Sequence, residues 1–165
     1  MALVTSPHRE ATLESRTLYN LAVEKIKRNN FREALNHLVQ ALKIAPTNPV
    51  YRSYFGYCLA QVEGDFDRAI RFCKRASESR PMDPVLRVNL GRVYRLKGDN
   101  SSAHAEFLGA WRVCKGHPAA AAELTRMGVR RPPIIPFLPR SHWCNKYLGI
   151  LRARLERRLL NRRSY

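Results

Sequence analysis

The chain has 165 residues, 45% hydrophobic and 26% charged, a composition typical of a folded protein with room for one core. Thirty Lys and Arg against thirteen Asp and Glu give a net charge of +17, which predicts attraction to polyanions or acidic protein segments. No stretch approaches the roughly 18 apolar residues of a membrane-spanning helix, and the first residues lack the pattern of a secretory signal. We therefore expect a cytoplasmic protein.

The chain contains an internal repeat. Residues 1–14 precede it, and we expect a partly disordered lead-in there. The sequence then repeats with a period of 34 to 35 residues over residues 15–48, 49–83 and 84–117. Small residues recur in three columns of the aligned copies: Ala22, Gly56 and Gly91; Ala34, Ala69 and Ala103; and Ala41, Ala76 and Ala110.

Each copy of the repeat predicts two helices packed against each other. The small columns allow the two helices to approach closely, and larger apolar residues such as Leu21, Phe55 and Leu90 fill the remaining space. Turn signals separate the helices of each pair, at Asn29-Asn30, Gly64-Asp65 and Gly98-Asp99-Asn100. The middle copy has one extra residue in this turn region.

The third copy resembles a known repeat family most clearly. Its Leu90-Gly91 with Tyr94, and its Ala103 with Phe107, match the L-G-x2-Y and A-x3-F parts of the tetratricopeptide repeat signature. The resemblance covers residues 15–117 and implies an all-α solenoid of three helix-turn-helix hairpins. The family's first-column Trp is missing, and its place is taken by Leu18, Arg52 and Arg87.

Two further segments follow the repeats. Residues 118–127 include an alanine-rich run that favours a helix, and Gly128 favours its end, so we expect a cap helix that completes a unit over residues 15–128. Residues 129–165 form a different segment. Its first part contains four prolines within residues 129–140, which predict an extended linker.

The remainder of this segment predicts a basic amphipathic helix. Its apolar side chains recur every four residues, with Trp143, Tyr147, Leu151 and Leu155 on one face. Residues 129–165 hold ten Lys and Arg against one acidic residue, a net charge of +9. Two modes of action stay open. Either the apolar face docks on the solenoid or a partner, or the basic face contacts an anionic membrane surface or nucleic acid.

No combination of residues predicts catalysis. The four cysteines lack paired ligand spacing, the five histidines form no metal-binding motif, and no phosphate-binding glycine loop occurs. We therefore expect no enzymatic activity, no catalytic residues, no metal, no cofactor and no small-molecule substrate.

The family resemblance implies where a partner binds. In proteins similar to this one, the first helices of the hairpins line a concave groove that holds a peptide. The groove residues expected here are Arg16, Tyr19, Asn20, Lys27, Tyr54, Tyr57, Asn89, Arg92 and Arg95. Four cations and no carboxylate in this set favour a peptide with acidic groups, because arginine binds carboxylates well and tyrosine covers apolar side chains.

We therefore expect a non-catalytic adaptor that binds an acidic peptide segment of a protein partner. One subclass of the family binds the C-terminal carboxylate of chaperone tails with a clamp of Lys, Asn, Asn, Lys and Arg. The corresponding positions of this chain are Tyr19, Val23, Tyr54, Val85 and Asn89. None of them matches, which argues against a chaperone tail as the partner. One alternative is a polyanion binder that acts through residues 129–165. Another is a repeat-type secretion chaperone, although that family is usually acidic.

Overall fold

The computed structural model describes residues 7–128 and 147–148, and every regular element within them is a helix. Seven helices occupy residues 7–128: α1 (Pro7–Lys27), α2 (Phe31–Ile44), α3 (Pro49–Val62), α4 (Phe66–Ser79), α5 (Pro84–Lys97), α6 (Asn100–Val113) and α7 (Pro118–Arg126). The chain divides into two units, Met1–Gly128 and Val129–Tyr165. The predicted all-α solenoid of three hairpins and a cap helix is confirmed.

Proline and polar caps set where the helices begin. The helices α3, α5 and α7 start at Pro49, Pro84 and Pro118, where the fixed φ of proline suits the first helical position. The preceding residues, Asn48, Asp83 and His117, accept hydrogen bonds from free backbone N–H groups of the first turn. In α2, α4 and α6 the caps are Asn30, Asp65 and Asp99, which accept from the N–H three residues later.

The first helix is longer than the sequence predicts. α1 has 21 residues, whereas α3 and α5 have 14 each. Residues 7–14, which the sequence analysis assigned to the lead-in, belong to α1. The reason is that no glycine or proline follows Pro7 before the end of this helix, so nothing interrupts it.

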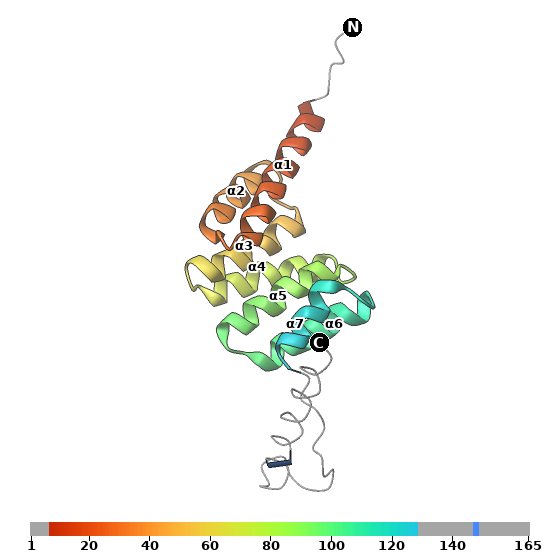
Figure 1. The fold of residues 1–165 in the computed structure, drawn as a ribbon. Helices are drawn as coiled ribbons and strands as arrows, with labels where there is room; N and C mark the ends of the chain where they lie inside the picture. The colour runs from red at the N-terminus through yellow and green to blue at the C-terminus, as the bar shows by residue number, and fades with distance from the viewer. Residues whose placement is uncertain (1–6, 129–146, 149–165) are drawn as a thin grey trace, which may run out of the picture. The chain divides into compact units, whose positions relative to one another are not determined.

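The helices pack in the order of the chain (Figure 1), as hairpins α1/α2, α3/α4 and α5/α6, with α7 against α5 and α6. The alanine columns lie inside these hairpins, and Ala34, Ala69 and Ala103 are fully buried. The glycine column shows how close the helices come. A methyl group added at Gly91 would lie 2.6 Å from the Phe107 ring, so only glycine fits there without a shift.

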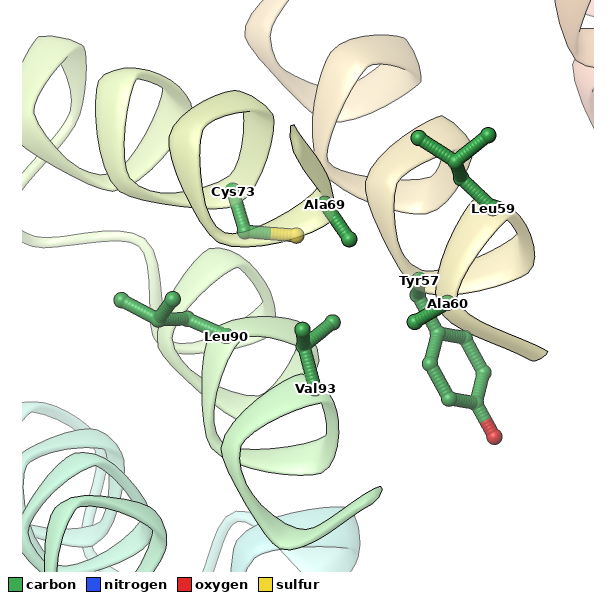
Figure 2. Close-up of a cluster of buried hydrophobic side chains, with 7 residues drawn as sticks. All are labelled: Tyr57, Leu59, Ala60, Ala69, Cys73, Leu90 and Val93. Atoms are coloured by element: carbon green, nitrogen blue, oxygen red, sulfur yellow. The ribbon is translucent and has the colours of Figure 1, made fainter. Parts of the chain in front are cut away.

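The central core lies between α3, α4 and α5. Figure 2 shows its seven buried side chains: Tyr57, Leu59 and Ala60 of α3, Ala69 and Cys73 of α4, and Leu90 and Val93 of α5. The Cys73 thiol donates to the Ser53 carbonyl oxygen at 3.3 Å, and burial raises the pKa of this thiol to about 12. Cys73 therefore stays protonated and acts as a small apolar group.

The buried alanine columns make a direct prediction about stability. We expect Ala34→Leu and Ala69→Leu each to lower the free energy of unfolding by about 1–3 kcal/mol, because the added carbons have no room. Urea denaturation measures the effect. Ala105→Leu is the matched control, because Ala105 is exposed on α6 and its replacement should change stability by less than about 0.5 kcal/mol. Unchanged midpoints in both core variants would contradict the packing described above.

Candidate functional site

Side-chain contacts join the first helices of the three hairpins to the cap helix. Tyr19 of α1 contacts the aromatic rings of α3, Tyr57 of α3 contacts Arg92 of α5, and Arg92 bonds Glu123 of α7. We call the surface carried by α1, α3, α5 and α7 the first-helix face. It corresponds to the groove-lining helices of the sequence analysis, with α7 added at one end.

One end of the first-helix face is aromatic. The Tyr19 ring stacks on Tyr51 with a centroid separation of 5.1 Å, and it meets the edge of the Tyr54 ring at 5.3 Å. Burial, and to a lesser degree Tyr54, raise the pKa of Tyr19, so its phenol stays neutral. This end therefore offers a neutral surface with apolar ring faces, which suits contact with apolar side chains.

The opposite end of the face is charged, and its central group is a buried carboxylate. The Glu123 side chain is only 2% exposed, and Arg92 donates a hydrogen bond from Nε to Glu123 Oε1 at 2.8 Å. The Arg92 guanidinium also lies over the Tyr57 ring, with its Cζ 5.4 Å from the ring centroid. The arginine is therefore held from two sides, by a carboxylate and by an aromatic ring.

Two more arginines surround the same carboxylate. Arg95 Nη2 lies 3.6 Å from Glu123 Oε2, and Arg126 Nη1 lies 3.8 Å from Oε1. Three cations thus face one buried anion, which leaves a local net charge of +2. The three arginine side chains are partly exposed, so the excess positive charge at this end of the face can attract a further negative group from outside.

Unused hydrogen-bonding atoms lie in the same region. Asn89 is fully buried and donates from Nδ2 to Ser53 Oγ at 3.2 Å, which ties α5 to α3. Within the described part of the chain, Asn89 Oδ1, Arg95 Nε and Glu123 Oε2 are buried without a hydrogen-bond partner. Two of these atoms, Arg95 Nε and Glu123 Oε2, belong to the charged end, where Arg95 Nη2 lies 3.6 Å from Glu123 Oε2.

The structure places the expected groove residues at different depths. Arg16, Asn20 and Lys27 are exposed on α1, and Lys27 pairs with Glu24 at 2.6 Å. Tyr19, Tyr54, Arg92 and Arg95 are partly buried, whereas Tyr57 and Asn89 are buried.

Two contacts bear on how these residues can be used. The Asn89 amide nitrogen donates to Ser53 inside the fold. Two carboxylates from outside the expected set, Glu24 and Glu123, lie beside its cations.

Glu123 is the residue of the candidate site that the sequence analysis missed. It lies outside the three repeats, so no column of the repeat pattern marks it. The available signal was that Glu123 is the only acidic residue of α7, in a helix otherwise rich in alanine. Such a residue on a helix expected to pack against an arginine-bearing helix is a candidate ion-pair partner.

The expected docking residues of the second unit lie mostly outside the described residues. This applies to Trp143, Leu151 and Leu155, whereas Tyr147 is described and is exposed. The docking of this segment therefore stays a prediction. Over residues 7–128 and 147–148, no group of three or more His, Cys, Asp or Glu is placed to hold a metal ion. Nor is any helix there long and apolar enough to cross a membrane.

Comparisons with known proteins agree with this architecture. The family model described as Tetratricopeptide repeat matches residues 15–48. No curated protein matches. The Sgt2 TPR domain from Aspergillus fumigatus is 22% identical, with coverage of 69% of this chain and 76% of that domain and a TM-score of 0.57.

Two other solved structures are similar. The first TPR of Spaghetti (RPAP3), bound to the HSP90 peptide SRMEEVD, is 15% identical, covers 70% of this chain and 90% of that one, and has a TM-score of 0.56. The type III secretion translocator chaperone SycD of Yersinia enterocolitica is 18% identical, with 68% and 84% coverage and a TM-score of 0.53. At these identities the likeness concerns the fold. Together with the family model, it confirms the resemblance to the tetratricopeptide repeat family.

The buried carboxylate predicts a specific loss of stability. We expect Glu123→Gln to lower the free energy of unfolding by about 1–3 kcal/mol, because it leaves Arg92 and Arg95 without their counter-charge. Urea denaturation at low ionic strength measures this loss. Glu78→Gln, an equivalent change at an exposed position of α4, is the control and should have little effect. Equal effects of the two substitutions would show that Glu123 contributes nothing beyond a surface charge.

Proposed function

We propose that this chain is a non-catalytic adaptor that binds an extended, acidic segment of a partner protein along the first-helix face. A peptide partner is supported by the fold, because a TPR domain of similar fold holds the HSP90 peptide SRMEEVD. The acidic character is argued from this chain's own residues.

The observation that carries the proposal is the pairing of Glu123 with Arg92 and Arg95. These arginines hold a carboxylate within the chain, so their guanidinium groups are already placed to bind one. Arg126 adds a third cation, and its side chain is 67% exposed, so it is open to a ligand. A carboxylate of the partner therefore meets a net positive site whose geometry is largely preformed.

The aromatic end specifies the rest of the ligand. Tyr19 and Tyr54 are partly buried and leave part of their surface open, which suits an apolar side chain of the partner. Arg16 and Asn20 are exposed on the neighbouring surface of α1 and can bond the peptide's polar groups. We therefore propose a segment in which apolar and acidic residues are both present, with the acidic residues nearer α7.

The proposed ligand differs from the chaperone tails bound by the carboxylate-clamp subclass. The clamp columns hold Tyr19, Val23, Tyr54, Val85 and Asn89 here, so the five polar clamp side chains are not reproduced. Since Asn89 is fully buried, it cannot serve as a clamp residue without rearrangement. The free C-terminus of a peptide is therefore not a required feature of the proposed partner.

A second candidate function rests on residues 129–165. Their net charge of +9 favours binding to an anionic membrane surface or to nucleic acid, in addition to any partner on the first-helix face. The likeness to SycD concerns the fold alone, and the net charge of +17 does not favour the secretion chaperone alternative.

Selection from a random peptide library displayed on phage tests the proposed function. With the full chain as bait, we expect enriched peptides to contain Asp or Glu beside aromatic or aliphatic residues. Arg95→Gln should lower the affinity of an enriched peptide about tenfold, because it removes one cation from the site. The Arg92–Glu123 ion pair is kept, and its atoms are closer together, at 2.8 Å, than the 3.6 Å of the Arg95–Glu123 pair.

Arg32→Gln is the matched control for this experiment. Arg32 is exposed on α2, outside the first-helix face, so the same loss of one positive charge should leave the affinity nearly unchanged. Enrichment of peptides without acidic residues, or an equal loss of affinity in both variants, would refute the proposed site.

A further inference from the structure

A hollow of about 270 Å³ lies outside the residues assigned to the first-helix face. Its lining residues are Leu42 of α2, Pro46 of the following turn, Arg52 of α3, and Phe72 and Arg75 of α4. Pockets for drug-sized ligands occupy roughly 300–1,000 Å³. The hollow is therefore of a size for one or two side chains of a partner.

The two arginines give this hollow its chemistry. Arg52 donates from Nε to the Pro46 carbonyl oxygen at 2.7 Å, which fixes its guanidinium against the turn between α2 and α3. Among the described residues, neither Arg52 nor Arg75 forms an ion pair. The hollow thus combines one oriented guanidinium and a second, exposed one with the apolar side chains of Leu42 and Phe72.

The third repeat shows what an arginine in this position binds. Arg87 aligns with Arg52, and its Nε likewise donates to the carbonyl oxygen of the preceding proline, Pro81, at 3.3 Å. Its Nη1 then pairs with Glu106 Oε2 at 3.2 Å. A carboxylate therefore completes the same arrangement one repeat later.

The second repeat has the arginine without the carboxylate. When the copies are aligned on Ala69 and Ala103, Phe72 takes the place of Glu106, and Arg75 takes the place of Gly109. In the second repeat, the aromatic ring of Phe72 thus stands where the third repeat has a carboxylate, and Arg75 adds a second cation beside Arg52. A carboxylate from outside the chain is thus the group that would complete this site.

We infer that the hollow between α2, α3 and α4 is a second docking site, which binds an acidic side chain of a partner protein. The carboxylate bonds Arg52 and Arg75, and an adjacent apolar residue of the partner packs on Leu42 and Phe72. Residues 129–165 are poor occupants, because they carry ten cations and one acidic side chain. The inference does not rest on the proposed function of the first-helix face.

Nuclear magnetic resonance of arginine Nε–H groups tests this inference on the full chain. The probe is acetyl-Leu-Glu-amide, and the neutral analogue acetyl-Leu-Gln-amide is its control. We expect saturable shifts of the Arg52 and Arg75 signals with the acidic peptide and much smaller shifts with the neutral one. Equal shifts with both peptides, or none with either, would overturn the inference.

Substitutions separate this site from other positive surfaces. Arg75→Ala should weaken binding of the acidic peptide at least about fivefold, whereas Arg71→Ala, at an exposed position of the same helix outside the hollow, should not.

Phe72→Glu should abolish binding of the acidic peptide, because it places a carboxylate beside Arg52, as in the third repeat. Because Phe72 also packs on Phe55, with ring centroids 5.0 Å apart, Arg75→Ala decides the outcome if that variant fails to fold.

The same titration distinguishes the hollow from the first-helix face. Arg95→Gln should leave the shifts of Arg52 and Arg75 unchanged, because Arg95 does not line the hollow. Loss of peptide binding in Arg95→Gln, with retention in Arg75→Ala, would assign the peptide to the first-helix face and refute the second site.

Discussion

The hairpins of this solenoid depend on how closely their helices approach at the small-residue columns. Ala34, Ala69 and Ala103 are fully buried, and a methyl group at Gly91 would collide with Phe107. This close approach fixes the distance between the two helices of a hairpin. The contacts on the first-helix face join neighbouring units, because Tyr19 reaches α3, Tyr57 reaches α5 and Arg92 reaches α7.

The repeated framework carries two kinds of positive site that differ in how their charge is balanced. On the first-helix face, three arginines surround one buried carboxylate, Glu123, so the ion pairs hold the cap helix and leave excess positive charge. In the hollow between α2, α3 and α4, Arg52 is oriented by a carbonyl oxygen instead of an anion. Both arrangements use arginine, whose planar group can bond a fixed partner and a ligand at the same time.

The repeat pattern predicted the fold well because each repeat obeys local rules. The alanine columns, the Pro49 and Pro84 starts and the turn residues are visible in sequence and act over a few residues. The site was less predictable, because its key contacts join residues from different units of the pattern. Glu123 lies outside the repeats and pairs with Arg92, which is 31 positions earlier in the sequence. Asn89 forms a hydrogen bond inside the fold with Ser53, which is 36 positions earlier. Periodicity identifies which face a side chain lies on, but it does not identify the side chain across from it.

The cap of α7 gives the charged end a further property. Asn48 and Asp83 begin α3 and α5 with side-chain oxygens, but α7 begins with His117, whose Nδ1 accepts from the Ala120 N–H at 3.3 Å. A neutral imidazole has one acceptor nitrogen, so the His117 side chain accepts from one backbone N–H, whereas Asn48 Oδ1 accepts from both Val50 and Tyr51 at the start of α3. The helix that carries Glu123 therefore begins with fewer side-chain cap bonds than α3, and its first turn is the part of the charged end that its cap holds least.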